Sequence, residues 1–358
     1  MKKLRVGIVF GGRSGEHEVS VTSASSIFKH IDRHKYDPVP IRIEKDGKWS
    51  FPDHEPTATN VAQAIAQARA NQTSLTSTTS DPGLARLNLD VVFPVLHGPY
   101  GEDGTVQGLL EVAGIAYVGN GVLASAAGMD KAVMKVLFEG AGLPVCAWHG
   151  FVRHQWDTDR HAIEARVAAL GLPAFVKPAN LGSSVGISKV KRAGDMAGAI
   201  ESAFEFDRKV VVEAAVSRAR EIECAVLGND DPRTSLPGEI VPSREFYDYE
   251  AKYLDDASKT VVPADLPPAT IAEVQRLAVA AFRAIDGSGL ARVDFLVDAG
   301  TGTIYLNEIN TMPGFTNISM YSKMWEASGI GYSELVDRLI QLALERHRIK
   351  QQLKTSAL

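Results

Sequence analysis

The residues best suited to chemistry lie late in the chain, in a segment whose pattern is typical of a β-hairpin. Two strand-like runs, residues 291–297 and 304–310, flank a glycine-containing turn at 298–302. Because successive side chains of a strand point to opposite faces, each run groups its alternate residues on one face. The groups are Arg292, Asp294 and Leu296 on the first run and Ile304, Leu306, Glu308 and Asn310 on the second. Pairing about the turn then places Asp294 opposite Glu308.

Asp294, Glu308 and Asn310 would present two carboxylates and an amide oxygen on one rigid face. Oxygen ligands of this kind suit Mg²⁺, which keeps part of its coordination for the phosphates of a bound nucleotide. The alternative is a solvated strand face with isolated charges. The hydrophobic residues between these positions indicate strands that are otherwise buried, which favours the metal-binding hypothesis.

A second candidate segment combines a lysine with a loop rich in glycine and serine: Lys177-Pro178-Ala179-Asn180-Leu181-Gly182-Ser183-Ser184-Val185-Gly186. Such residues let backbone N–H groups surround a phosphate, and Lys177 supplies positive charge. The segment lacks the G-K-[ST] ending of a Walker A loop. Taken alone, it is as consistent with an ordinary Gly/Ser turn as with a phosphate site.

The elements that must position these residues begin with a strand over residues 4–10 and a helix over 20–30, joined by Gly11-Gly12-Arg13-Ser14-Gly15. A second buried strand is predicted over 89–96. This order predicts an open α/β unit, but the first loop lacks the G-x-G-x-x-G spacing of a dinucleotide site. Between the two strands, residues 60–70 are expected to be helical and the polar run 73–80 to form mobile surface.

The rest of the chain alternates helical and strand-like patterns. Helices are expected over 130–142 and 271–285, and strands over 174–178, 210–213 and 221–227. Thr270 and Glu273 have capping-box spacing at the start of the second helix, and Gly287 stands at its end. The segment from about 235 to 259 is too long for a plain connection, so it is expected to be an active-site lid.

Composition limits the classes of function. The 358 residues exceed what one hydrophobic core usually serves, so two or three domains are expected. With 38 Lys and Arg against 43 Asp and Glu, and no long basic run, nucleic acid is not an expected partner. Only Cys146 and Cys224 are present, which suits a reducing compartment, and no stretch approaches the roughly 20 apolar residues that span a bilayer. A cytoplasmic protein without membrane insertion is expected.

The ordered set of motifs resembles that of the D-alanine:D-alanine ligases, a family of the ATP-grasp superfamily, along nearly the whole chain. The matching segments are residues 11–18, 97–104, 130–131, 177–186, 247–253, 292–294 and 307–314. Each segment is short, but the set in this order is highly specific. The resemblance implies a three-domain ATP-grasp architecture of mixed α/β and α+β class. Its parts would be an N-terminal open α/β domain over 1–125, a small central domain over 126–210 and a C-terminal catalytic domain over 211–358.

The resemblance also implies a reaction. ATP would phosphorylate the carboxylate of one D-alanine, and the amine of a second would attack the resulting acyl phosphate. The products would be D-alanyl-D-alanine for peptidoglycan precursors, ADP and phosphate. Two Mg²⁺ ions, with Mn²⁺ as an alternative, would bridge the ATP phosphates, and a homodimer is the assembly that the family suggests.

Carried over position by position, the resemblance assigns roles to single residues. The catalytic set would be Glu16, Ser183, Tyr253, Arg292 and Gly314. The D-alanine substrates would be bound by His97, Lys252 and Ser319. ATP would be bound by Lys131, Phe175, Lys177, Ser184, Glu213, Glu221 and Phe295, and the metal ions by Asp294, Glu308 and Asn310.

Some of these assignments are more specific. Glu16 would receive the ammonium group of the first D-alanine, and Ser183 and Tyr253 would close the site by hydrogen bonding toward it. Arg292 and the backbone N–H of Gly314 would hold the oxyanion of the tetrahedral intermediate. Phe175 and Phe295 would sandwich adenine, although an aromatic residue on a strand is more often part of the core.

Three alternatives stay open on the sequence. A ligase that takes D-lactate or D-serine as the second substrate would share the same architecture. A nucleotide-binding regulator without catalysis would not need the intact set Arg292, Asp294, Glu308 and Asn310. A dinucleotide-binding dehydrogenase would need a glycine fingerprint and a ribose-binding acid, which do not accompany the first strand.

Overall fold

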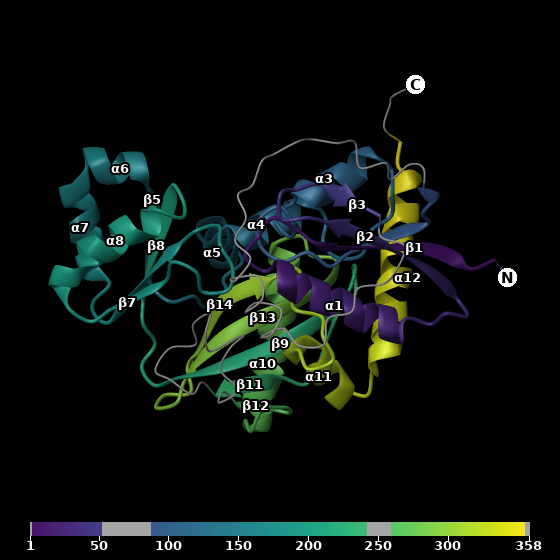
Figure 1. Cartoon of the computed structure of the whole chain (residues 1–358). Helices are drawn as coiled ribbons and strands as arrows, with labels where there is room; N and C mark the ends of the chain where they lie inside the picture. The colour runs from purple at the N-terminus through teal and green to yellow at the C-terminus, as the bar shows by residue number, and fades with distance from the viewer. Residues whose placement is uncertain (1, 52–86, 242–258, 355–358) are drawn as a thin grey trace.

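The computed structural model describes residues 2–51, 87–241 and 259–354 of the chain. Its strands form three separate sheets, and the helices lie around them (Figure 1). The helix expected over 60–70, the polar run 73–80, and Lys252 and Tyr253 fall outside the described residues. Within the described part, no helix has the length and apolar character needed to cross a membrane.

The N-terminal sheet has the strand order β3-β2-β1-β4, in which β1 runs parallel to both β2 and β4. Its elements are β1 (Leu4–Gly11), β2 (Tyr36–Ile43), β3 (Trp49–Ser50) and β4 (Val91–Pro94), with helices α1 (His17–His30), α3 (Thr105–Val112) and α4 (Val122–Met129). Val6 and Ile8 of β1 are fully buried, as the apolar run predicts for a parallel strand. The expected strand, helix and open α/β arrangement are confirmed.

A small lobe follows, built on a four-stranded antiparallel sheet with the order β5-β8-β6-β7. It contains β5 (Trp148–Val152), α6 (Arg153–Thr158), α7 (Arg160–Ala169), β6 (Ala174–Pro178), β7 (Ser188–Val190), the 3-10 turn η2 (Ala193–Asp195), α8 (Met196–Phe204) and β8 (Lys209–Ala214). Helix α5 (Lys131–Gly140) leads into it. The lobe has a hydrophobic core of its own around Phe151, Trp156 and Val212.

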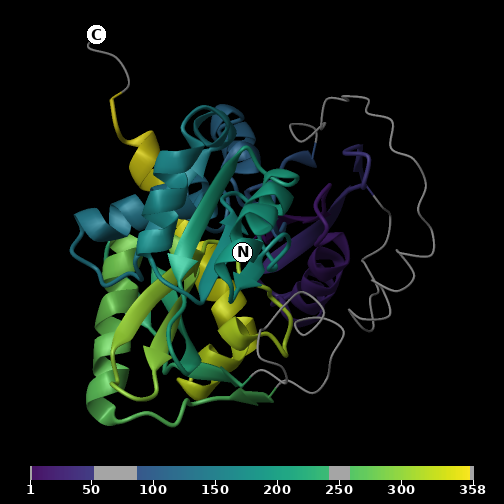
Figure 2. The same ribbon diagram turned by 90° about the vertical axis from the view of Figure 1, so that its left-hand side faces the viewer.

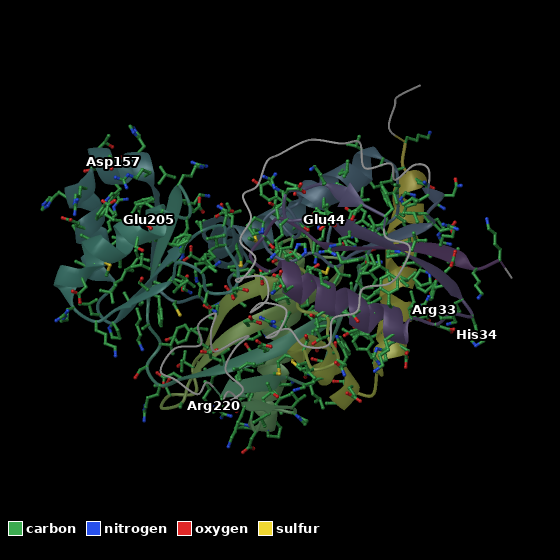
Figure 3. The ribbon with its side chains drawn as sticks, viewed as in Figure 1. Arg33, His34, Glu44, Asp157, Glu205 and Arg220 are labelled. Atoms are coloured by element: carbon green, nitrogen blue, oxygen red, sulfur yellow. The ribbon has the colours of Figure 1, made fainter. Side chains whose placement is uncertain are left out.

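The lobe stands at one end of the molecule (Figure 1), and it faces the viewer when the molecule is seen from that end (Figure 2). Figure 3 shows its labelled side chains Asp157 and Glu205 at the end opposite to Arg33 and His34, which follow α1. The lobe therefore touches the rest of the protein along one side.

The large sheet is antiparallel, with the order β12-β11-β9-β13-β14 and β10 paired to β9. Its elements are β9 (Ala219–Gly228), β10 (Arg233–Thr234), β11 (Gly238–Val241), β12 (Lys259–Val261), β13 (Gly289–Asp298) and β14 (Ile304–Asn310), with helices α10 (Pro268–Ala284), α11 (Met320–Ala327) and α12 (Tyr332–Gln351). Helix α12 also packs against α1 and β4, so that one core joins the large sheet to the N-terminal sheet.

The lid expected from about 235 to 259 overlaps two strands at its ends. Strands β11 and β12 pair antiparallel, with Glu239 opposite Val261, so residues 238–241 and 259–261 belong to the large sheet. The intervening residues 242–258 lie outside the described part of the chain.

The hairpin of β13 and β14 confirms one prediction and corrects another. Asp294 lies opposite Glu308, as expected, but the register then shifts so that Phe295 lies opposite Leu306. Asn307 is the extra residue of this bulge, and it reverses the alternation on its strand. Leu306 is consequently fully buried in the core, and the expected grouping of Ile304 and Leu306 with Glu308 is wrong.

Helix α10 begins differently from the sequence prediction, but Gly287 stands at its end as expected. It begins at Pro268, whose ring suits the first helical position, so Thr270 lies inside the first turn and does not cap it. Glu273 pairs instead with Arg276. At the other end, Asp286 adopts the left-handed conformation with φ 61°, and Gly287 donates its N–H to the carbonyl of Phe282 at 2.9 Å.

Gly287→Ala is expected to lower the free energy of unfolding by about 1–3 kcal/mol, because the new methyl group has no room. It would lie 2.6 Å from a ring carbon of the fully buried Phe282 and 2.7 Å from the Phe282 carbonyl oxygen. Gly198→Ala in α8 is the matched control. Nothing lies within 4 Å of its new methyl group, so it should stabilise the helix by up to about 1 kcal/mol. Urea unfolding of both variants tests the pair; equal effects would contradict the steric argument.

Candidate active site

A row of acidic side chains crosses three neighbouring strands of the large sheet. Asp294 on β13 lies opposite Glu223 on β9 and opposite Glu308 on β14. We call this the site face of the large sheet; by strand register it also carries Glu221, Arg292 and Asn310. The fold therefore gathers the hairpin residues singled out from the sequence on one surface.

Arg292 neutralises part of this acidic row. Its Nε and Nη2 donate to the two carboxylate oxygens of Asp294 at 2.8 and 2.7 Å, and its Nε lies 3.2 Å from Glu223 Oε2. Burial lowers the pKa of Arg292, but the charges of Asp294 and Glu223 outweigh burial and hold this pKa well above its usual value. The guanidinium stays charged and is fixed by a two-pronged contact.

Sequence reasoning missed Glu223, which is buried beside Arg292. A signal was available, because Glu223 stands two residues after Glu221 on the same strand and so shares its face. The pairing of β9 with β13 could not be read from the sequence, and only that pairing brings Glu223 to Asp294.

The small lobe contributes a second group of charges. Lys177 on β6 donates from Nζ to Glu213 Oε2 on β8 at 2.9 Å, and lies 3.5 Å from the side-chain oxygen of Asn307 at the bulge of β14. Burial raises the pKa of Glu213, but the ammonium groups of Lys135 and Lys177 outweigh burial and lower it. The ring of Phe175 faces the Lys177 and Lys189 ammonium groups at 5.9 and 5.6 Å. These residues lie where the lobe meets the site face.

The Gly/Ser loop links the lobe to the N-terminal sheet. Ser183 donates a hydrogen bond from its hydroxyl to Glu16 Oε1, so the expected contact between these two residues is present. Ser183 and Ser184 both adopt left-handed backbone conformations, with φ 52° and 57°. Non-glycine residues rarely do so, and they cluster at functional sites when they do. Lys131 fastens the same loop by donating from Nζ to the carbonyl of Leu181 at 2.6 Å.

His97 is buried and connects two loops of the site. Its Nδ1 donates to the carbonyl of Met312 at 2.9 Å, and its Nε2 lies 3.3 Å from the hydroxyl of Ser23. Burial lowers the pKa of His97 despite the nearby charge of Glu16. A neutral His97 therefore holds the loop after β4 against the segment that follows β14. This geometry favours a role in positioning over direct contact with a substrate.

Glu102 is a further buried acid that the sequence did not single out. Burial and the neighbouring charge of Glu16 raise the pKa of Glu102 to about 8. Its Oε1 accepts the N–H of Gly98 at 2.7 Å. A methyl group added at Gly182 would lie 3.2 Å from Glu16 Oε2 and 4.0 Å from Glu102 Oε1, so both acids face the Gly/Ser loop. At neutral pH the carboxyl group of Glu102 is protonated.

Gly314 and Ser319 come together after β14. A methyl group on Gly314 would lie 3.3 Å from the Ser319 hydroxyl, which accepts the N–H of Thr316 at 3.0 Å. Ser319 precedes α11, so its hydroxyl stands at a helix N-terminus, where negative charge is stabilised. A carboxylate is the kind of group that this corner can bind.

Phe295 does not belong to this surface. It is 1% exposed and packs in the core with Ile222 and Val293, on the opposite face of β13 from Asp294. The expectation that it stacks on adenine is corrected by this placement. Phe175, in contrast, is half-buried and shares its face of β6 with Lys177.

The residues that could hold a metal ion are the oxygen donors of the site face. Among the described residues, no three His, Cys, Asp or Glu side chains form a ready-made metal group. Asp294, Glu308 and Asn310 offer two carboxylates and one amide oxygen. This set fits an ion that completes its coordination with substrate phosphates and water. Their chemistry suits Mg²⁺ or Mn²⁺ better than a softer metal.

Comparison with known proteins agrees with the ordered motifs. Residues 5–120 match a family model described as D-ala D-ala ligase N-terminus, and residues 137–341 match D-ala D-ala ligase C-terminus. A relative from Solibacter usitatus named D-alanine--D-alanine ligase is 50% identical over 349 residues, covering 98% of each chain. Another with this name, from Heliobacterium modesticaldum, is 48% identical over 370 residues, covering 100% of this chain and 99% of the relative.

Two solved structures are similar along nearly their whole length. The D-alanine-D-alanine ligase from Coxiella burnetii has a TM-score of 0.80 and 36% identity, and the alignment covers 98% of this chain and 97% of that one. The VanG D-Ala:D-Ser ligase from Enterococcus faecalis has a TM-score of 0.81 and 36% identity, with 96% and 100% coverage. The ATP-grasp fold expected from the sequence is thereby confirmed.

Replacing Glu102 with Gln is expected to remove a pH-dependent loss of stability. The folded protein keeps the proton of Glu102 up to about pH 8, whereas the unfolded chain releases it near about pH 4.3. Rising pH therefore favours the unfolded wild type across this window, and the loss levels off above about pH 8. Thermal midpoints of both ligand-free proteins between about pH 5 and 9 measure the difference. A difference that does not change with pH would contradict the raised pKa.

Proposed function

The chain belongs to the D-alanine–D-alanine ligase family, and on that premise we propose that it joins two D-alanine molecules at the expense of ATP through an acyl phosphate. The observation that carries the proposal is the meeting of three parts at one place. The Gly/Ser loop of the small lobe reaches Glu16, and Lys177 reaches the bulge of β14 beside the site face. A D-amino acid and the γ-phosphoryl group can thus be held next to each other.

In the first step, Glu16 receives the ammonium group of the first D-alanine as a charge-matched acceptor. The carboxylate of this D-alanine attacks the γ-phosphorus of ATP, which forms the acyl phosphate and releases ADP. Lys131, Lys177 and the backbone of residues 183–184 hold the phosphates, since positioning and charge neutralisation provide most of the catalysis in phosphoryl transfer. In the ligand-free structure Lys177 donates to Glu213, and it is proposed to turn from this contact to a phosphate when ATP binds.

Asp294, Glu308 and Asn310 are assigned to two Mg²⁺ ions, with Mn²⁺ as an alternative. Bound there, the ions would neutralise phosphate charge and bridge the nucleotide to the protein. Asp294 would then serve both the metal and Arg292, whose guanidinium it already holds. Arg292 is kept in place by this pair before any substrate arrives.

In the second step, Ser319 binds the carboxylate of the second D-alanine. The ammonium group of this molecule first loses a proton to solvent, because only the neutral amine has a lone pair with which to attack, and the departing phosphate takes up the second proton that the nitrogen loses on forming the amide. The amine adds to the carbonyl carbon of the acyl phosphate, and Arg292 and the N–H of Gly314 hold the oxyanion. Collapse of the tetrahedral intermediate expels phosphate and leaves the new amide. The roles assigned to Lys252 and Tyr253 concern residues outside the described part of the chain.

The nucleoside is assigned to the junction of the small lobe and the site face. Glu213 accepts a hydrogen bond from the adenine amino group, Glu221 accepts hydrogen bonds from the ribose hydroxyls, and Phe175 packs against the base. The half-buried ring of Phe175 and the position of Glu213 directly opposite it on β8 support this placement. Ser184 of the Gly/Ser loop binds ATP through its backbone, which holds the phosphates.

The cellular setting is part of the proposal. A D-alanyl-D-alanine product would enter peptidoglycan precursor synthesis, and the substrates ATP and D-alanine place the reaction in the cytoplasm. We also propose a homodimer and a division of the chain into domains at residues 1–125, 126–210 and 211–358. The second substrate is proposed to be D-alanine rather than D-serine, because the relatives compared above that share about half of their residues with this chain are named D-alanine--D-alanine ligases.

ADP release is expected to require both D-alanine and a divalent cation. A coupled assay with D-alanine, L-alanine, D-serine and D-lactate measures which substrates are used, and EDTA tests the cation. L-alanine should give no more ADP than the assay without an amino acid, because Glu16 fixes the ammonium group of the first substrate, and inversion at the α-carbon then turns its carboxylate away from the γ-phosphoryl group. Equal rates with D- and L-alanine, or full activity in EDTA, would refute the proposal.

Glu308→Gln is expected to reduce turnover by at least about 10-fold with little change in the thermal midpoint, because one ligand charge is lost while the side-chain shape is kept. Glu326→Gln, an exposed glutamate of α11, is the control and should retain full turnover. Raising the Mg²⁺ concentration should restore part of the activity of Glu308→Gln. Normal turnover in that variant would exclude Glu308 from metal binding.

A further inference from the structure

Lys135 is a buried lysine that the reaction described above does not use. It lies on α5 and is 0% exposed, and its ammonium group has no hydrogen-bond partner within the described residues. The nearest anion is Glu213, whose Oε1 lies 3.4 Å from Lys135 Nζ. Taking a lysine out of water is unfavourable unless its charge is compensated, so the placement calls for an explanation.

Glu213 is shared between two lysines through different oxygens. Its Oε1 faces Lys135 at 3.4 Å, and its Oε2 accepts from Lys177 at 2.9 Å. One carboxylate therefore faces two ammonium groups, and the charge of Glu308 acts on Lys177 as a second acid. A single lysine suffices to neutralise Glu213, so Lys135 can serve it while Lys177 has other partners.

The two lysines differ in what surrounds them. Lys177 is 8% exposed and has a second neighbour, the side-chain oxygen of Asn307, on the side of the large sheet. Lys135 is fully buried, and its ammonium group has no second polar neighbour of this kind in the part of the chain that the structure describes. Lys177 is thus the exchangeable partner of the carboxylate and Lys135 the permanent one.

We propose that Lys135 is a positioning residue for ATP: it remains as the counter-ion of Glu213 when Lys177 turns to the phosphates, so that Glu213 Oε2 is free to accept the 6-amino group of adenine. This inference rests on the proposed roles of Lys177 and Glu213. Without Lys135, the departure of Lys177 would leave a buried carboxylate with no counter-ion, which would favour its protonated form. A protonated Glu213 is a poorer acceptor, and Lys177 would be held back from the phosphates.

The test compares ATP with purine riboside 5′-triphosphate, which lacks only the 6-amino group. KM for each nucleotide is measured at saturating D-alanine and Mg²⁺ in the wild type and in Lys135→Met, which keeps length and loses charge. The wild type should prefer ATP by about tenfold, as for one hydrogen bond to a charged acceptor. In Lys135→Met, KM for ATP should rise about tenfold and the preference should shrink to about twofold or less, with kcat changed far less than KM.

Thermal midpoints without ligands separate this role from a purely structural one. Lys135→Met leaves Glu213 and Lys177 as a one-to-one pair, so its midpoint should equal or exceed that of the wild type. Lys135→Gln is measured in parallel as a second neutral side chain. Lys350→Met is the control, because this exposed lysine is paired with Glu111 on the surface and should change neither midpoint nor nucleotide preference.

Four results would overturn the inference. If KM rises equally for both nucleotides in Lys135→Met, the lysine does not act through the adenine amino group. If both Lys135 variants fail to fold, Lys135 serves the fold. If the wild type itself does not distinguish the two nucleotides, the inference fails together with the proposed role of Glu213, whereas an unchanged preference in Lys135→Met refutes the inference alone.

Discussion

The site depends first on the need of a partly buried guanidinium for anions. Arg292 is half-buried on the site face of the large sheet, where water solvates it only in part, and Asp294 and Glu223 meet its charge from the same strand and from the next. This arrangement requires that β9 and β13 be antiparallel neighbours in one register. The separate pairing of β13 with β14 aligns Glu308 on the other side. Arg292 offsets part of the mutual repulsion among these acids, so that three carboxylates can lie side by side on neighbouring strands and still leave negative charge for a cation.

Much of this could be predicted from the sequence, because the relevant patterns are local. The hairpin turn aligned Asp294 with Glu308, and the glycine and serine residues marked the loop that reaches Glu16. Where the sequence prediction was incomplete or wrong, the position of the residue depends on contacts between segments that are distant in the chain. Glu223 comes to the site only because β9 pairs with β13. Phe295 was expected to stack on adenine, but it is buried in the core because helix α10 covers its face of β13. A bulge of one residue at Asn307 changed the faces of Ile304 and Leu306, and nothing in the hairpin sequence announces that bulge.

The same bulge gives the site a contact that regular pairing would not. Asn307 is the residue without a partner across the strands, and its side chain meets Lys177 of the small lobe. Bulges commonly re-aim a side chain next to functional sites. The bulge at Asn307, which a strict alternation of side chains does not predict, thus connects the large sheet to the small lobe where the nucleotide is proposed to bind.

The separate core of the small lobe has a mechanical consequence. Helix α12 packs the N-terminal sheet and the large sheet into one hydrophobic core, whereas Phe151, Trp156 and Val212 belong to a core that no other part of the described chain shares. Polar contacts such as those of Ser183 with Glu16 and of Lys177 with Asn307 hold the lobe to its neighbours. A rotation of the lobe about its connections would break a few such contacts and expose little of its own core. A change in the position of the lobe would therefore be opposed mainly by hydrogen bonds and ion pairs, and far less by the hydrophobic effect.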